Sequence, residues 1–165
     1  MESRAKLLGH PIHQMLIPIP AGLFIVGSVL DIVDLFVDAQ WIPVVSFWNL
    51  TLGIFSGLFA AIFGLIDWTK ITSNTRAKRV GAAHGIGNVI AVALFAVAVR
   101  LRWGNEGYAT DTLALTLEVI AFAILGVTAW LGGELVDRLG IGVDDGANMD
   151  APSSLRTKHA TGGQR

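Results

Sequence analysis

Residues 89–99 read Val-Ile-Ala-Val-Ala-Leu-Phe-Ala-Val-Ala-Val, eleven apolar residues without a polar one among them. A helix on the surface of a soluble protein carries a polar stripe along one side, and this stretch has none. It belongs to a longer run, residues 80–99, which is 20 residues long. A helix of about this length crosses about 30 Å of hydrocarbon. We therefore interpret residues 80–99 as a membrane span.

Three further runs of similar character lie at residues 15–37, 41–66 and 112–131. Over the whole chain of 165 residues, 53% are hydrophobic and 15% are charged, whereas ordinary soluble domains have about 25% charged residues. The sequence predicts an all-α, integral-membrane four-helix bundle formed by residues 1–140. The segment 141–165 is rich in small, acidic and turn-forming residues, and we predict a disordered tail there.

The composition also excludes several classes of function. The net charge of −1 offers no basic surface, so we expect no nucleic-acid partner. The absence of cysteine excludes disulfides, cysteine zinc sites and a cysteine nucleophile. We find no phosphate-binding glycine loop and no convincing internal repeat. No nucleophile or substrate pocket can be named, so the sequence leaves open whether the protein is an enzyme.

The lysines and arginines orient the predicted bundle. With four spans, the segments before the first, between the second and third, and after the fourth lie on one side of the membrane. These segments hold ten of the twelve lysines and arginines, and the other side holds Arg100 and Arg102. By the positive-inside rule, both termini are predicted to be cytoplasmic.

Polar residues gather near the predicted cytoplasmic ends of the spans. The starts of spans one and three and the ends of spans two and four share that leaflet. The residues placed there are His10, His13, Asp67, His84, Asn88 and Glu134. Imidazoles ligate haem iron, zinc and copper, while carboxylates ligate metals or orient ligand histidines. Two interpretations stay open: the histidines bind a cofactor with help from the carboxylates and the amide, or all six are ordinary helix-end residues.

One face of the second span consists of small residues. Gly53, Gly57, Ala60 and Gly64 recur at spacings of three and four, which places them on one side of a helix. Small residues let helices approach closely in lipid. The same face continues to Asp67, so we expect this carboxylate to face the bundle.

A second polar set lies toward the opposite leaflet. Asp31 and Asp34 lie near the end of the first span, Glu118 lies within the fourth, and Arg100 follows the third. Charges inside membrane spans are rare and usually paired. We predict structural interhelical ion pairs with Arg100 as the basic partner. The alternative is a proton path through Asp31 and Glu118, and no carboxylate near the midplane supports it.

Short motifs at four places resemble one family of bacterial proteins. They are Gly9-His10-Pro11-Ile12-His13, Gly64-Leu65-Ile66-Asp67-Trp68, His84 with Asn88, and Trp130-Leu131-Gly132-Gly133-Glu134. Together they resemble the "domain of unknown function" family numbered twenty-two thirty-one, a group of predicted membrane proteins, over nearly all of residues 7–145. Gln14 departs from the proline expected after the second histidine. The resemblance implies a multi-pass protein of the bacterial inner (plasma) membrane. Some members are fused or adjacent to Rieske-type or cytochrome-type domains. This association implies membrane redox chemistry.

Three functions remain open. The first is electron transfer by haem b or a non-haem metal bound by His10, His13 and His84, with a redox partner protein or a second copy of the chain. Its most specific form holds haem b between spans one and three with His84 and one of the other two histidines. The second is a non-catalytic membrane scaffold or accessory subunit without a cofactor. The third, transport of a small solute or a proton, has the least support.

Overall fold

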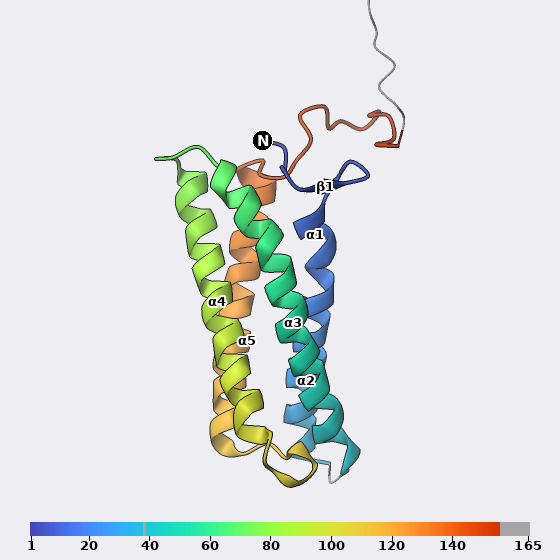
Figure 1. Ribbon diagram of the computed structural model, residues 1–165, viewed down its shortest axis with the longest axis vertical. Helices are drawn as coiled ribbons and strands as arrows, with labels where there is room; N and C mark the ends of the chain where they lie inside the picture. Colours follow the sequence, from blue (N-terminus) through green and yellow to red (C-terminus); the bar gives the residue numbers. More distant parts are fainter. Residues whose placement is uncertain (38, 156–165) are drawn as a thin grey trace, which may run out of the picture.

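The computed structural model describes residues 1–37 and 39–155 and shows four long helical rods in an antiparallel bundle (Figure 1). The rods are formed, in order, by α1 (Ile12–Leu16) with α2 (Pro18–Asp34), by α3 (Trp41–Lys70), by α4 (Arg76–Arg102), and by α5 (Thr112–Gly133) with a π-helical turn η2 (Glu134–Arg138). A 3-10 turn η1 (Glu106–Tyr108) connects α4 to α5. Two short antiparallel strands, β1 (Lys6–Leu7) and β2 (His10–Pro11), precede α1.

All four rods are long and apolar enough to cross a membrane, so the prediction of four spans is confirmed. Large apolar side chains cover the outside of the bundle: Phe55 is 68% exposed, Val89 64% and Leu65 60%. An outer surface of this kind is solvated by lipid rather than by water. All four rods extend beyond the predicted spans at one end: α1 begins at Ile12, α3 continues to Lys70, α4 begins at Arg76, and α5 with η2 continues to Arg138.

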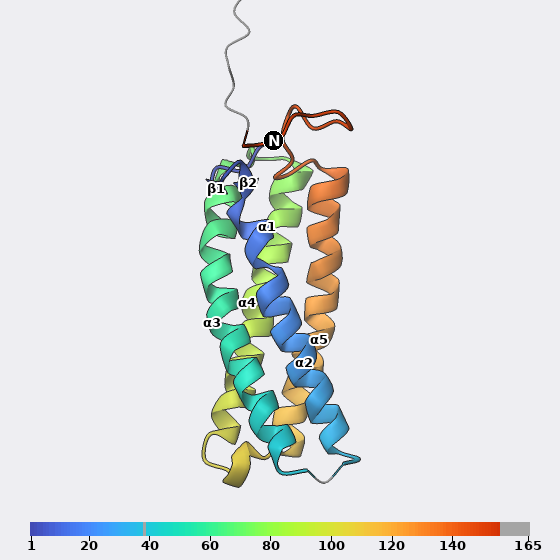
Figure 2. The ribbon, with the colours of Figure 1, turned by 90° about the vertical axis from the view of Figure 1, so that its right-hand side faces the viewer.

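The N-terminus and the segment that follows η2 lie at one end of the bundle, together with the α3–α4 connection (Figures 1 and 2). We call this the terminal end. The α2–α3 and α4–α5 connections lie at the opposite end, which we call the far end (Figure 1). The two ends of the described chain therefore share one side, as an even number of spans requires.

Residues 141–155 contain turns and no helix, and part of this segment lies against the N-terminal arm. Lys6 Nζ is 2.5 Å from Glu2 Oε2 and 3.6 Å from Asp144 Oδ2. The hydrogen bond that Lys6 donates to the Glu2 carboxylate is the main reason why the pKa of Lys6 is raised. The backbone amide of Gly146 lowers the pKa of the Asp144 carboxyl. The rest of the predicted tail, residues 156–165, lies outside the described residues.

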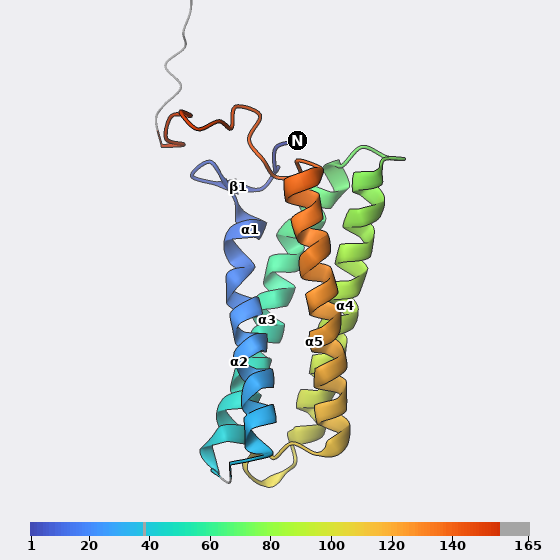
Figure 3. The ribbon, with the colours of Figure 1, turned by 180° about the vertical axis from the view of Figure 1, so that it is seen from behind.

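The rods pack as two hairpins. α2 lies mainly against α3, and α4 lies mainly against α5 (Figure 3). Glycines allow this close packing: a Cβ added to Gly53 would lie 2.9 Å from the Phe24 ring, and one added to Gly87 would lie 2.5 Å from the Thr128 methyl group. The predicted packing role of the small-residue face on α3 is therefore confirmed for Gly53.

The two hairpins are related by an internal repeat. Core-facing residues of the first rod recur 71 positions later in α4: His13 and His84, Pro20 and Ala91, Phe24 and Phe95, Gly27 and Ala98, Asp31 and Arg102. Those of α3 recur 68 positions later in α5: Ser46 and Ala114, Leu50 and Glu118, Gly53 and Ala121, Ala60 and Thr128. The expectation of no convincing internal repeat was made from residue types, whereas the recurrence is one of core-facing positions. The positions recur, but most of the residue types differ, and a comparison of residue types does not detect this.

Equivalent residues touch each other across the interface between the hairpins. The rings of Phe24 and Phe95 stack with centroids 4.3 Å apart and an interplanar angle of 13°, and Asp31 pairs with Arg102. Contacts between equivalent positions are the mark of a two-fold axis. Because both hairpins start at the terminal end, this pseudo-two-fold axis runs along the helices.

The packing predicts that Gly53→Val destabilises the bundle. The added side chain meets the Phe24 ring, which is itself stacked on Phe95, and overpacking of this kind costs about 1–3 kcal/mol. The midpoint of thermal unfolding, followed by tryptophan fluorescence in detergent, is expected to fall by several degrees. Gly126→Val is the matched control, because nothing lies within 4 Å of a Cβ at that position. Equal midpoints for the two variants would contradict the packing.

Candidate functional site: a histidine pair between the hairpins

His13 and His84 occupy equivalent places in the two hairpins, toward the terminal end. His13 Nδ1 lies 2.9 Å from the backbone oxygen of Ala60, and His84 Nδ1 lies 2.8 Å from that of Thr128. A carbonyl oxygen only accepts hydrogen bonds, so Nδ1 carries the hydrogen in both rings. The lone pair of each neutral imidazole is therefore on Nε2, the atom that is then able to bind a metal.

A glycine packs against each of the two rings. A Cβ added to Gly64 would lie 2.8 Å from His13 Cε1, and one added to Gly132 would lie 3.3 Å from His84 Cε1. Each glycine follows the residue with the acceptor carbonyl by four positions, which places it one helical turn further along the same face. The same local arrangement, a carbonyl and then a glycine, thus positions both imidazoles.

His13 and His84 come from different hairpins, and each is held by a backbone oxygen of its own hairpin. On one side of the pair, Asn88 Nδ2 lies 3.1 Å from His84 Nε2 and donates to the backbone oxygen of His84 at 2.9 Å. The Thr128 hydroxyl donates to Asn88 Oδ1 at 2.9 Å. His13, His84, Asn88 and Thr128 therefore form one polar layer inside an apolar bundle, which we call the histidine layer.

The other predicted site residues lie outside this layer. Asp67 accepts hydrogen bonds from the Ser3 hydroxyl at 2.6 Å, from the Arg4 amide at 2.8 Å and from the Ala5 amide at 3.3 Å. This carboxylate therefore anchors the N-terminal arm. It follows Ala60 by seven residues, which is about 10 Å along a helix, and this separates it from the histidine layer.

His10 and Glu134 are also engaged at the terminal end. Glu134 Oε1 forms an ion pair with Arg76 Nη2 at 2.5 Å, and the exposed His10 lies 3.2 Å from the Ser154 hydroxyl. Of the six residues predicted for the site, the structure brings together His13, His84 and Asn88. Within residues 1–37 and 39–155, no group of three or more His, Cys, Asp and Glu side chains is arranged to hold a metal ion.

A second polar group lies at the far end, where Arg102 is completely buried. Its Nη1 lies 2.8 Å from Asp31 Oδ2 and 3.1 Å from Glu118 Oε1. Its other nitrogens donate to backbone oxygens at 3.0 Å, Nη2 to Pro43 and Nε to Tyr108. We call Asp31, Arg102 and Glu118 the far-end cluster.

The assignment of these ion pairs to Arg100 was wrong. Residues two apart on a helix point about 200° away from each other, so Arg100 is on the exposed side of α4 when Arg102 faces the core. A helical wheel that starts from the buried Phe95 would have placed Arg102 inward, since it lies seven residues, or about two turns, further on. Asp34, also predicted to take part, is the last residue of α2.

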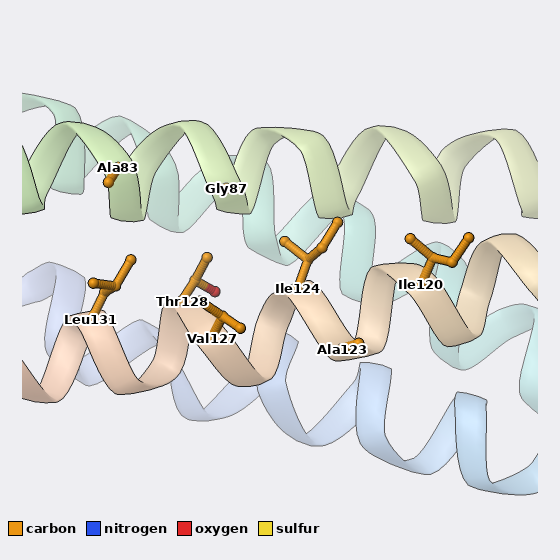
Figure 4. A pocket seen from close by; sticks show the side chains of 8 residues that line it. All are labelled: Ala83, Gly87, Ile120, Ala123, Ile124, Val127, Thr128 and Leu131. Atoms are coloured by element: carbon orange, nitrogen blue, oxygen red, sulfur yellow. The ribbon is translucent and has the colours of Figure 1, made fainter.

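An open apolar groove runs along α4 and α5 (Figure 4). Its lining residues are Ala83, Gly87, Ile120, Ala123, Ile124, Val127, Thr128 and Leu131. Thr128 is the polar member, and its hydroxyl is already bonded to Asn88 and to the backbone oxygen of Leu125. The groove therefore offers no unpaired hydroxyl to a polar ligand.

The family of predicted membrane proteins called DUF2231 matches residues 9–145. The chain belongs to this family. The match contains both hairpins, the histidine layer and the far-end cluster of this DUF2231 protein. No curated protein and no solved structure matches the chain. Family membership and the four apolar rods thus establish a multi-pass predicted membrane protein.

The contacts of Asp67 predict that Asp67→Ala releases the N-terminal arm. Three donors lose their acceptor, and one hydrogen bond to a charged group contributes about 1.5–3 kcal/mol. Trypsin cleavage after Arg4 and Lys6 is expected to become roughly tenfold faster or more, since about 1.4 kcal/mol corresponds to a factor of ten. Asp137→Ala, at an exposed acid in η2, is the control and leaves the cleavage rate unchanged. Equal rates in the two variants would refute the anchoring role.

Proposed function

We propose that His13 and His84 bind haem b as its two axial ligands and that the protein carries electrons within the membrane. The observation that supports the proposal is that the two imidazoles, one from each hairpin, have the same hydrogen-bonding arrangement. In both, a backbone carbonyl holds Nδ1, and the lone pair remains on Nε2. Ligand histidines in metalloproteins are commonly oriented by such a bond.

The number of ligands favours haem over a bare metal ion. A protein zinc site takes three or four ligands from side chains, and the described residues offer no such group. Haem iron is already held by the porphyrin and takes only its axial ligands from the protein. The layer next to the histidines is apolar, with Pro20, Phe24 and Val92 within 4 Å of a Cβ added to Gly57.

Ligation by His84 requires Asn88 to release Nε2. The Asn88 amide keeps its bond to the backbone oxygen of His84 and its bond from Thr128. Release therefore costs one hydrogen bond, about 1 kcal/mol. His13 has no amide at the corresponding position, because Ile17 stands where the repeat places Asn88. Haem bound to this pair would supply a one-electron couple.

The test is an optical spectrum of detergent-purified protein from cells supplied with haem, recorded oxidised and after reduction with dithionite. We expect a Soret band that shifts on reduction and is lost in both His13→Ala and His84→Ala. His10→Ala is the matched control and keeps the band, because His10 is exposed in β2. A flat spectrum from folded protein would exclude haem, and metal analysis of the same sample would then test for a non-haem metal.

A non-catalytic scaffold or accessory subunit without a cofactor is the second candidate. The bond between Asn88 and His84 favours it, because it pairs Nε2 within the protein. On this hypothesis the spectrum is flat, and the role of His84 is to hold α4 on α5 through Thr128. His84→Ala then lowers the unfolding midpoint of a protein that never contained haem.

We further propose that the terminal end faces the cytoplasm of a bacterial inner membrane and that a redox partner docks there, nearest the histidine layer. The distribution of lysine and arginine supports this orientation. Because the chain has no cysteine, single cysteines report the side directly. A membrane-impermeant maleimide is expected to label Glu106→Cys in intact cells and Ser73→Cys only after lysis. The reverse pattern would invert the orientation.

A further inference from the structure

We infer that the far-end cluster is a proton-binding site, in which the carboxyl groups of Asp31 and Glu118 share one proton. The cluster is closed to solvent. The side chains of Asp31 and Arg102 are 0% exposed, and that of Glu118 is 1% exposed. Asp31 comes from α2, Arg102 from α4 and Glu118 from α5, so the cluster joins both hairpins.

The charges of the cluster do not balance without a proton. Arg102 contributes one positive charge, and two ionised carboxylates would contribute two negative charges. Among the described residues, the other groups that form hydrogen bonds with the cluster are neutral: the hydroxyls of Ser46 and Thr110 donate to Asp31, and two backbone oxygens accept from Arg102. An uncompensated charge buried inside a membrane protein is strongly unfavourable. One shared proton makes the cluster neutral.

The missing hydrogen-bond partner of one oxygen atom is a second, independent indication of the proton. Glu118 Oε2 is buried and has no hydrogen-bond partner among the described residues. The carboxyls of Glu118 and Asp31 both contact the same guanidinium nitrogen of Arg102, at 3.1 and 2.8 Å. Two ionised carboxylates repel and cannot bond, whereas a proton between them forms a hydrogen bond. The proton belongs to the pair rather than to either residue.

The loop between α4 and α5 covers this site. The Tyr108 ring stacks on Phe47 with centroids 4.0 Å apart, while its backbone oxygen accepts from Arg102 Nε at 3.0 Å. Tyr108 and Gly107 have φ angles of +57° and +61°, and a non-glycine residue rarely adopts such a value without stabilising contacts. These two contacts hold the loop against the far-end cluster.

The experiment uses infrared spectroscopy of the whole protein in lipid nanodiscs at pH 7, where exposed carboxyls are ionised. We expect the C=O stretch of a protonated carboxyl in the parent and its loss in both Asp31→Asn and Glu118→Gln. Glu106→Gln, at an exposed glutamate of η1, is the control and keeps the band. The absence of the band from the parent would overturn the inference.

Stability provides a second and independent measurement. Glu118→Gln places an N–H donor where the proton would lie, so its unfolding midpoint is expected to stay close to that of the parent. Glu118→Ala leaves Arg102 and Asp31 with an unfilled space and is expected to lower the midpoint by several degrees. An equal loss in both variants would contradict the shared proton. A rise in the midpoint when sodium replaces choline at constant ionic strength would assign the site to a metal cation instead.

Discussion

The hydrocarbon of the bilayer cannot hydrogen-bond, and this constraint explains the arrangement of the two polar layers inside the bundle. His13 and His84 reach backbone carbonyls of neighbouring helices, and Asn88 and Thr128 complete that layer. At the far end Arg102 uses all of its nitrogens. Between these two layers the interface consists of stacked aromatic rings and small residues. The protein thus has two polar layers separated by an apolar one.

The four spans could be predicted from the sequence because a membrane helix must be apolar on all sides, and such runs are visible without any knowledge of packing. The site was predicted only in part. Position along the chain placed His13 and Asp67 in the same leaflet, but two helical turns separate Asp67 from the carbonyl that holds His13. Rotation about the helix axis was equally decisive, because it turns Arg102 inward and Arg100 outward. To place a side chain, both the depth of its residue in the membrane and the rotation of its helix about the axis must be known. The sequence provides only an approximate depth.

The internal repeat shows which kinds of residue tolerate a position near a pseudo-two-fold axis. Two phenylalanines can face each other there, because stacked rings attract. Two aspartates or two arginines cannot, because like charges in a buried site repel strongly. The repeat accordingly has Asp31 in one hairpin and Arg102 in the other. At the charged layer the two hairpins therefore carry complementary residues. At the aromatic pair and the histidine pair they carry the same residue type.

The location of each polar contact also implies an order of assembly. The bonds of His13 to α3 and of His84 to α5 lie within single hairpins, so each hairpin can satisfy these polar groups as soon as it enters the membrane. The contacts of Arg102 with α2 and α3 cross from one hairpin to the other. Until the hairpins meet, Arg102 lacks the contacts it makes with the first of them. Bonds within each hairpin thus hold the two halves, and the contacts of a single arginine join one half to the other.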